Sequence, residues 1–228
     1  MMRETNDIVI YCEKYQNIKI NTRVKNPNNC QIVVMTNGQV RRLNRLENNI
    51  LNPLKKTFFN RNRIDLDSYS VFFVKSNYFD GTWGGNVQYL DKRLDNVQEK
   101  VFIQAAYCYQ IYNPEKAVLL IGNDNKEYDS KYFNIKLNTK IDNIIKKCIV
   151  SRLNRDGFIK TQDNTIEIAH EAEQIINEHV LSMFGISLAN LNFELEESDD
   201  HYLLRKECEW GKLVTKGEKT NDIIQFKN

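Results

Sequence analysis

Residues 161–197 contain a change of hydrophobic period that restricts the fold more than any other stretch of this 228-residue chain. Over residues 168–183, apolar side chains recur at steps of three and four, which predicts an amphipathic helix with one buried face. Gly185 follows, where a helix end commonly adopts a left-handed conformation. Over residues 186–195 the period is two, as in a strand, and it slips near residues 189–190, which predicts a bulge. A helix that leads directly into a strand requires a sheet on which to pack.

The N-terminal part of the chain, residues 7–112, has the spacing and composition of β-strands. Residues 30–36 and 69–75 are rich in β-branched and aromatic side chains, and residues 100–112 form a longer run of the same kind. Asn37-Gly38 follows the first of these runs. Both central residues of a type I′ turn need a positive φ, so this pair predicts a tight hairpin.

Helical signals replace strand signals after residue 112. Asn113-Pro114-Glu115 predicts a helix start, because asparagine caps the first N–H groups and proline has no N–H to lose. That helix is expected to stop at Gly122, and a second helix over residues 130–153 carries apolar residues along one face. Asp156-Gly157 is expected to break it. Strands, then helices, then one returning strand predict an α+β fold.

Glycines predict interruptions of regular secondary structure at two further places. Gly81, Gly84 and Gly85 favour turns or a bulge, and Gly211 and Gly217 argue against a long helix near the C-terminus. The predicted division of the chain is a β-rich subdomain at residues 1–112, a helical subdomain with a returning strand at residues 113–200, and a short C-terminal tail at residues 201–228.

The overall charge, the hydropathy and the cysteines of the sequence bear on the partners and the compartment expected for this protein. The formal net charge is +2, so global charge predicts no nucleic-acid partner. The sequence has no apolar run near the ~20 residues of a membrane span and no apolar core of a signal peptide at its start. The five cysteines are odd in number and scattered, which fits a reducing cytoplasm better than a disulfide framework. We therefore expect a cytoplasmic protein whose membrane contact, if it has one, is peripheral and at the inner face.

The order of these motifs resembles the SPFH or Band 7 superfamily, which includes stomatins, prohibitins and flotillins. The stretches that carry the resemblance are the strand at residues 101–112 leading into Asn113-Pro114-Glu115, where aspartate is the more usual first residue, the helix with residues 149–153, and Gly185-Ile186-Ser187-Leu188 before Leu191-Asn192-Phe193. The hairpin at residues 32–40 and the stretch 71–85 are similar to a narrower, soluble branch called virion-core-protein-like. Together these stretches fall within residues 7–197.

The resemblance implies a non-catalytic scaffold or adaptor without a cofactor, which associates with itself or with a protein partner. It also implies a fold of the SPFH type, with a β-rich subdomain before the helical one. We expect neither the N-terminal membrane anchor nor the long coiled coil of many members, and in this the sequence departs from the wider superfamily. Two alternatives stay open: a small α+β enzyme or ligand-binding protein, and a structural component of a phage or virus-like particle.

A basic and apolar stretch between residues 41 and 63 is the candidate membrane-contact site. Cations attract an anionic bilayer, and apolar side chains beside them insert at its interface. The alternative is a hairpin whose aromatic side chains belong to the core and whose charges are solvated. A nucleic-acid interface is a third interpretation, but no recognised binding motif accompanies the stretch. The candidate residues are Arg41, Arg42, Arg45, Leu54, Lys55, Lys56, Phe58, Phe59, Arg61 and Arg63.

An acidic stretch at the end of the returning strand is the candidate partner-contact site. It lacks the spacing and the glycine of a calcium-binding loop, so we predict no metal there. The alternative is a strand end whose carboxylates are simply solvated. The residues are Glu194, Glu196, Glu197, Asp199 and Asp200.

Three histidines complete the set of candidate residues. Glu167 and His170 have the Glu-x-x-His spacing of di-iron bundles, but such a site needs a second motif and further glutamates. His179 is expected at the boundary of the apolar stripe as a hydrogen-bonded residue, and His201 is expected to lie by itself in the tail. The sequence has no nucleophile motif and no phosphate-binding loop, so we predict no catalytic, cofactor or metal site.

Overall fold

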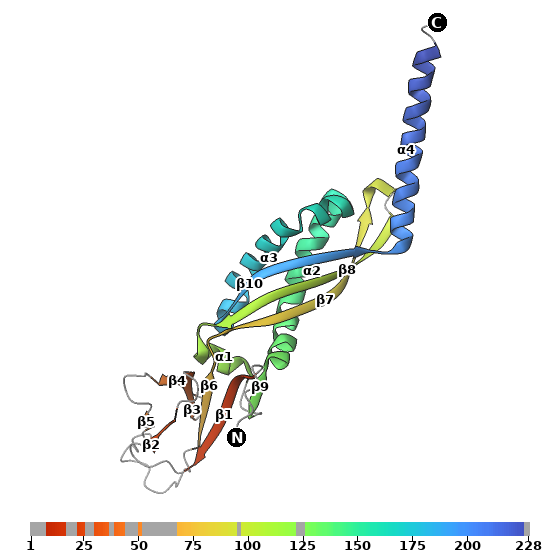
Figure 1. Cartoon of the computed structure of the whole chain (residues 1–228). Helices are drawn as coiled ribbons and strands as arrows, with labels where there is room; N and C mark the ends of the chain where they lie inside the picture. Colours follow the sequence, from red (N-terminus) through yellow and green to blue (C-terminus); the bar gives the residue numbers. More distant parts are fainter. Residues whose placement is uncertain are drawn as a thin grey trace. The chain divides into compact units, whose positions relative to one another are not determined.

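A computed structural model describes residues 8–16, 22–25, 30–36, 39–43, 50–51, 68–94, 97–121 and 126–225. These residues form helices and antiparallel sheets, so the predicted α+β class is confirmed (Figure 1). The chain divides into two compact units. Unit 1 comprises Met1–Thr82, Ala106–Ile141 and Glu173–Leu191, and unit 2 comprises Trp83–Ala105, Asp142–Ala172 and Asn192–Asn228. The subdomain boundaries expected at residues 112 and 200 stay predictions.

Unit 1 contains a five-stranded sheet in the order β4-β3-β6-β1-β9. Its strands are β1 (Ile8–Gln16), β3 (Gln31–Thr36), β4 (Gln39–Leu43), β6 (Ser68–Val74) and β9 (Glu127–Asp129). The strands predicted at residues 30–36 and 69–75 are therefore confirmed as β3 and β6. Thr36 pairs with Gln39 in the antiparallel β3–β4 register, which confirms the hairpin, although Asn37-Gly38 itself lies outside the described residues.

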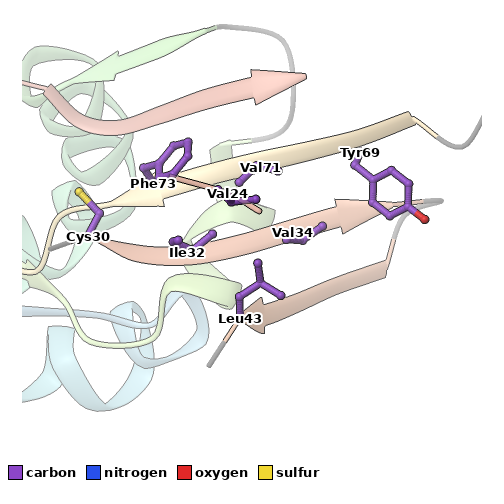
Figure 2. Close-up of a cluster of buried hydrophobic side chains, with 8 residues drawn as sticks. All are labelled: Val24, Cys30, Ile32, Val34, Leu43, Tyr69, Val71 and Phe73. Carbon is purple, nitrogen blue, oxygen red and sulfur yellow. The ribbon is translucent and has the colours of Figure 1, made fainter. Parts of the chain in front are cut away.

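One face of the five-stranded sheet carries a buried apolar cluster (Figure 2). Ile32 and Val34 of β3 alternate with residues of the opposite face, and they lie opposite Phe73 and Val71 of β6 in the antiparallel register. Tyr69 is fully buried at one end of the cluster. The cluster consists of Val24, Cys30, Ile32, Val34, Leu43, Tyr69, Val71 and Phe73. Because side chains alternate between the two faces of the sheet, strands of only six or seven residues can each place several apolar side chains in this core.

A second sheet has the order β10-β8-β7, with β7 at Tyr78–Asp91, β8 at Val97–Ile111 and β10 at Ile186–Glu197. Two short strands, β2 (Thr22–Arg23) and β5 (Ile50–Leu51), pair separately. The turn or bulge predicted around the glycines of β7 is wrong, because β7 continues through them. A Cβ on Gly81 would overlap the Tyr107 ring, and a Cβ on Gly85 would lie 2.6 Å from the Trp83 ring. These two glycines make room for aromatic rings within a continuous strand.

The first two helices begin and break where the sequence predicts. α1 (Pro114–Ile121) is capped by Asn113, whose Oδ1 accepts a hydrogen bond from the Lys116 N–H at 3.1 Å. α2 (Ser130–Asp163) has a non-helical residue at Gly157, with φ 73°, so the predicted break is confirmed. A Cβ at Gly157 would also approach the Arg93 guanidinium. The position therefore favours glycine for two reasons, the positive φ and the lack of room for a Cβ beside Arg93.

The predicted helix-to-strand transition is present as α3 (Thr165–His179), the 3₁₀ helix η3 (Leu181–Phe184) and β10. Gly185 has φ 65°, which confirms its left-handed conformation. Asn190 has φ 57°, and the buried positions of β10 change there from even to odd numbers, which confirms the bulge. Met183 differs from the prediction: it is 61% exposed, because the α-helix ends before it.

The longest departure from the sequence prediction is α4 (Asp199–Gln225), drawn in dark blue in Figure 1. Gly211 and Gly217 lie inside this helix, so the expectation that they prevent a long helix is wrong. A glycine in an exposed helix costs only about 1 kcal/mol relative to alanine, which the good helix formers around it outweigh. Among the described residues, no helix combines the length and apolarity needed to cross a membrane.

Candidate functional site

The N-terminal end of α4 is held by a buried cluster of charged and polar side chains in unit 2. We call this cluster the α4 base. The His201 side chain is fully buried, and the side chains of Asp91, Glu197 and Arg205 are 5%, 11% and 14% exposed. Residues this polar are seldom buried unless they are paired. The α4 base consists of Tyr89, Asp91, Glu197, His201 and Arg205.

His201 lies between two carboxylates. Its Nδ1 is 3.0 Å from Glu197 Oε2, and its Nε2 is 3.4 Å from Asp91 Oδ2 and 3.4 Å from the Tyr89 hydroxyl. The rings of Tyr89 and Phe158 meet the imidazole edge-on, with centroids 6.0 and 6.3 Å away. An imidazolium, which has an N–H on both nitrogens, would donate to both carboxylates at once. This arrangement joins β7, β10 and α4 at one buried point.

Arg205 adds a second tie between α4 and the end of β10. Its Nη2 donates to Glu197 Oε1 at 2.6 Å and its Nε lies 3.3 Å from Glu197 Oε2, a bidentate geometry. Its Nη1 also donates to Glu209 Oε1 at 3.2 Å. The hydrogen bond to Glu197 raises the pKa of the Arg205 guanidinium. Burial, helped by nearby carboxylates, raises the pKa of Tyr89 well above its usual range, so its hydroxyl stays protonated and can donate to Asp91.

Local sequence rules explain how the α4 base forms. Tyr89 and Asp91 are two apart on β7 and therefore point to one face of the sheet. His201 and Arg205 are four apart on α4 and therefore lie on one face of the helix. Ser198 begins the helix, because its Oγ accepts a hydrogen bond from the His201 N–H at 3.3 Å.

A small groove lies beside the α4 base. Its volume is about 160 Å³, well below the 300–1,000 Å³ typical of ligand pockets. His201 does not line it. The described residues also contain no group of three or more histidine, cysteine, aspartate or glutamate side chains placed to hold a metal ion. The groove is lined by Asp91, Arg93, Leu94, Phe158, Ile159, Arg205, Cys208, Glu209 and Lys212.

On the face opposite His201 and Arg205, α4 exposes large apolar side chains. Leu203 is 59% exposed and Trp210 is 70% exposed. They are seven residues apart, so they lie on the same face of the helix about two turns from each other. The helix continues to Gln225.

The predicted membrane-contact residues lie mostly outside the described residues. Arg41 and Arg42 belong to β4 and are exposed. The prediction for the stretch as a whole stays a prediction. The residues outside the described ranges are Arg45, Leu54, Lys55, Lys56, Phe58, Phe59, Arg61 and Arg63.

The predicted acidic stretch divides into two parts in the structure. Glu194, Glu196, Asp199 and Asp200 are exposed. Glu197 is instead part of the α4 base, so the expectation of a fully solvated strand end is wrong for this residue. The reason is that β10 ends where α4 begins, which brings Glu197 beside residues one and two turns further along.

The histidines also differ from their predictions. His201 does not lie by itself in a tail, because it is buried in the α4 base. The His179 side chain is 71% exposed, so its predicted place at the edge of the core is wrong. Glu167 binds Arg152 at 3.1 Å, and Glu171 binds the same guanidinium at 2.9 Å. The carboxylate of the Glu-x-x-His pair is thus engaged in an ion pair between α2 and α3.

Sequence reasoning missed Tyr89, Asp91 and Arg205. The four-residue spacing of Glu197, His201 and Arg205 is a signal that could have linked these three residues once a helix was assigned. Asp91 has no such signal, because 110 residues separate it from His201. No protein-family model matches this chain, and no curated protein matches it either.

Proposed function

We propose that this protein is a non-catalytic cytoplasmic scaffold or adaptor of the SPFH type, which associates with further copies of itself through α4. One observation carries the proposal. α4 is fixed at its base by buried, paired polar and charged side chains, while the opposite face of the same helix exposes Leu203 and Trp210. Exposed apolar side chains at a seven-residue spacing are typical of helices that pair with other helices.

The buried cluster suits a structural role. His201 is buried, and the pKa of the Tyr89 hydroxyl beside its ring is raised, so this hydroxyl is a poor nucleophile. Buried ion pairs add little net stability compared with apolar residues, but they fix geometry because a displaced partner leaves a charge unpaired. In this proposal the α4 base sets the direction in which α4 leaves the end of β10. A helix with a fixed direction can present its apolar face to a second copy reproducibly.

The order of elements supports the SPFH part of the proposal. β8 leads into the Asn113-capped α1, α2 carries Arg152, and Gly185 precedes β10. These are the positions on which the resemblance in sequence depends. α4 then follows the returning strand, where the sequence alone favoured a short tail.

The mass of the protein in solution tests the proposal. We expect light scattering behind a sizing column to give a mass above the 26.9 kDa of one chain, rising with concentration. At high ionic strength, where salt screens charge pairs, Leu203→Ala/Trp210→Ala should return the mass to that of one chain. Ile166→Ala is the matched control, because Ile166 is 82% exposed on α3 and should leave the mass unchanged. A wild-type protein that is a monomer at every concentration would overturn the proposal.

Peripheral membrane contact is a second part of the proposal and has its own test. We expect sedimentation with anionic vesicles but not with neutral ones, because cations beside apolar side chains bind an anionic interface. Replacement of Lys55, Lys56, Arg61 and Arg63 by glutamate should abolish the sedimentation. Binding that survives this replacement would show that the stretch is not the contact.

A further inference from the structure

A surface in unit 1, around η3, combines exposed apolar side chains with cations. Tyr112, Leu119 and Met183 are 50%, 60% and 61% exposed. Lys116 and Lys140 are exposed beside them. We call these five residues the η3 patch. Single exposed apolar residues are ordinary, but a group with a basic rim marks a binding surface.

Contacts with η3 hold three residues of the η3 patch, Tyr112, Lys116 and Lys140. The Tyr112 hydroxyl donates to the Ser182 carbonyl at 3.4 Å, and the Lys116 ammonium donates to the same oxygen at 3.1 Å. The Lys140 ammonium lies 5.3 Å from the centroid of the Phe184 ring. The end of β8, α1, α2 and η3 therefore meet at this surface.

The backbone supports the same surface. The Gly185 carbonyl accepts hydrogen bonds from the N–H groups of Tyr112 and Asn113, both at 3.0 Å. Gly185 is left-handed, and a Cβ there would overlap the Asn113 carbonyl oxygen. The close approach of η3 to the start of α1 thus depends on a glycine.

The two lysines of the η3 patch have no acidic partner in the part of the chain that the structure describes. Every ion pair found there involves other cations. Lys116 contacts a carbonyl, and Lys140 contacts an aromatic ring. Their positive charges are therefore available to an external anion.

A complementary surface exists on the same chain, in unit 2. Four exposed carboxylates at the junction of β10 and α4 take part in none of the ion pairs between described residues. Tyr202 follows them and is 46% exposed. We call the four carboxylates the acidic end, and they belong to Glu194, Glu196, Asp199 and Asp200.

We propose that the η3 patch of one molecule binds the acidic end of a second copy, with the Tyr202 ring against the apolar side chains of the patch. This inference rests on the proposed function and deepens it, because it adds a second, head-to-tail contact to the contact through α4. A contact between two different surfaces leaves one of each free at the ends of a dimer. Unless the two copies form the same contact twice about a two-fold axis, it continues into a ring or a filament, whereas a symmetric contact through α4 alone stops at two copies.

Charge complementarity favours a second copy over a bilayer. An anionic bilayer would also attract Lys116 and Lys140 and accept Met183. Every further copy of the chain, however, carries the complementary surface, which is the four carboxylates of the acidic end next to the exposed Tyr202 ring. Opposite charges across such an interface orient the partners and speed their encounter.

The test uses the full chain with Leu203→Ala/Trp210→Ala, so that contact through α4 is removed from the measurement. In this background we expect weak self-association at low salt that declines as salt rises. Lys116→Gln/Lys140→Gln neutralises the patch. Glu194→Gln/Glu196→Gln/Asp199→Asn/Asp200→Asn neutralises the acidic end and keeps the shapes of the side chains. Each variant alone should dissociate at least about tenfold more readily, since several charge pairs are lost.

Mixing the two neutralised variants gives the decisive result. One supplies an intact patch and the other an intact acidic end, so the mixture should form a 1:1 complex with the affinity of the parent and then stop. Lys147→Gln is the matched control, because Lys147 is an exposed lysine of α2 outside the patch, and it should change nothing.

Two outcomes would overturn the inference and leave the proposed function intact. In the first, wild-type protein associates through α4 but the α4-disabled parent stays a monomer at low salt. In the second, the neutralised variants associate as the parent does. Anionic vesicles that bind the parent but not the patch variant, without any complex in the mixture, would assign the patch to a membrane and also overturn it.

Discussion

The α4 base and the η3 patch both combine charged side chains with aromatic rings. They differ in that the charged groups of the α4 base are largely buried and paired within the chain, whereas those of the η3 patch are exposed and lack an acidic partner among the described residues. In the α4 base, His201 and Arg205 are buried, and each lies within 3.0 Å of an oxygen of Glu197. In the η3 patch, Lys116 and Lys140 are exposed and have no carboxylate partner among the described residues. A buried charge without a partner costs several kcal/mol, whereas an exposed one costs almost nothing.

This difference indicates what each region does. The charges of Arg205 and Glu197 in the α4 base are matched within the chain, so they are not available to a partner. Charges in the η3 patch need no match for folding, so they are free to be matched by another molecule. The two regions therefore predict opposite responses to substitution: loss of stability at the α4 base, and loss of association at the η3 patch.

The largest expected effect is at Glu197. Glu197→Ala removes the acceptor of both His201 and Arg205 and leaves their donors buried, which should lower the free energy of unfolding by about 3 kcal/mol. Urea unfolding followed by circular dichroism measures it. Glu196→Ala is the control, because its side chain is exposed and should change stability by less than about 0.5 kcal/mol. Equal stability of the two variants would mean that the α4 base contributes no net stability.

A smaller effect is expected where the η3 patch is anchored. Gly185→Ala forces a left-handed alanine and places a methyl group against the Asn113 carbonyl, which should cost about 2 kcal/mol. Thermal unfolding measures the loss. Gly84→Ala is the control, because a Cβ there makes ordinary contacts at 3.8 Å or more and should be tolerated. If Gly185→Ala keeps full stability, η3 is not tied to α1 as the hydrogen bonds indicate.

The smallest effect has the opposite sign and concerns α4 beyond its base. A Cβ at Gly211 meets nothing within 4 Å, and the residue is exposed in a helix. Gly211→Ala should therefore raise the free energy of unfolding by about 0.5–1 kcal/mol, because alanine loses less backbone freedom than glycine. The same urea series measures it. A destabilised variant would indicate that a second copy packs closely against this position, which sharpens the proposal for α4.

The elements predicted from sequence were those governed by nearby residues. The hairpin at β3–β4, the Asn113 cap, the break at Gly157 and the left-handed Gly185 all depend on a few adjacent positions. The bulge at Asn190 followed from the slip of the apolar period alone. These features are set by steric limits on φ and ψ and by alternation of side chains, so a short stretch of sequence contains them.

The incorrect predictions involved residues whose surroundings come from elsewhere in the chain. The glycines of β7 looked like turn residues, but the Tyr107 and Trp83 rings explain two of them. β9 was missed because a strand of three residues is too short to show a hydrophobic period. It is defined only by its pairing with β1. His201 looked isolated because Asp91 is distant in sequence.

By itself, then, the sequence determined the α+β class, the succession of strands and helices apart from β9 and α4, and the position where the chain turns from helix to strand. Only the tertiary structure decided which charges are buried together and which stay exposed. The physical reason is that hydrophobic period and backbone conformation are local properties, while the cost of burying Asp91, Glu197 and His201 is recovered only when three separate elements meet. The α4 base is thus a product of the fold, and so is the contrast with the η3 patch.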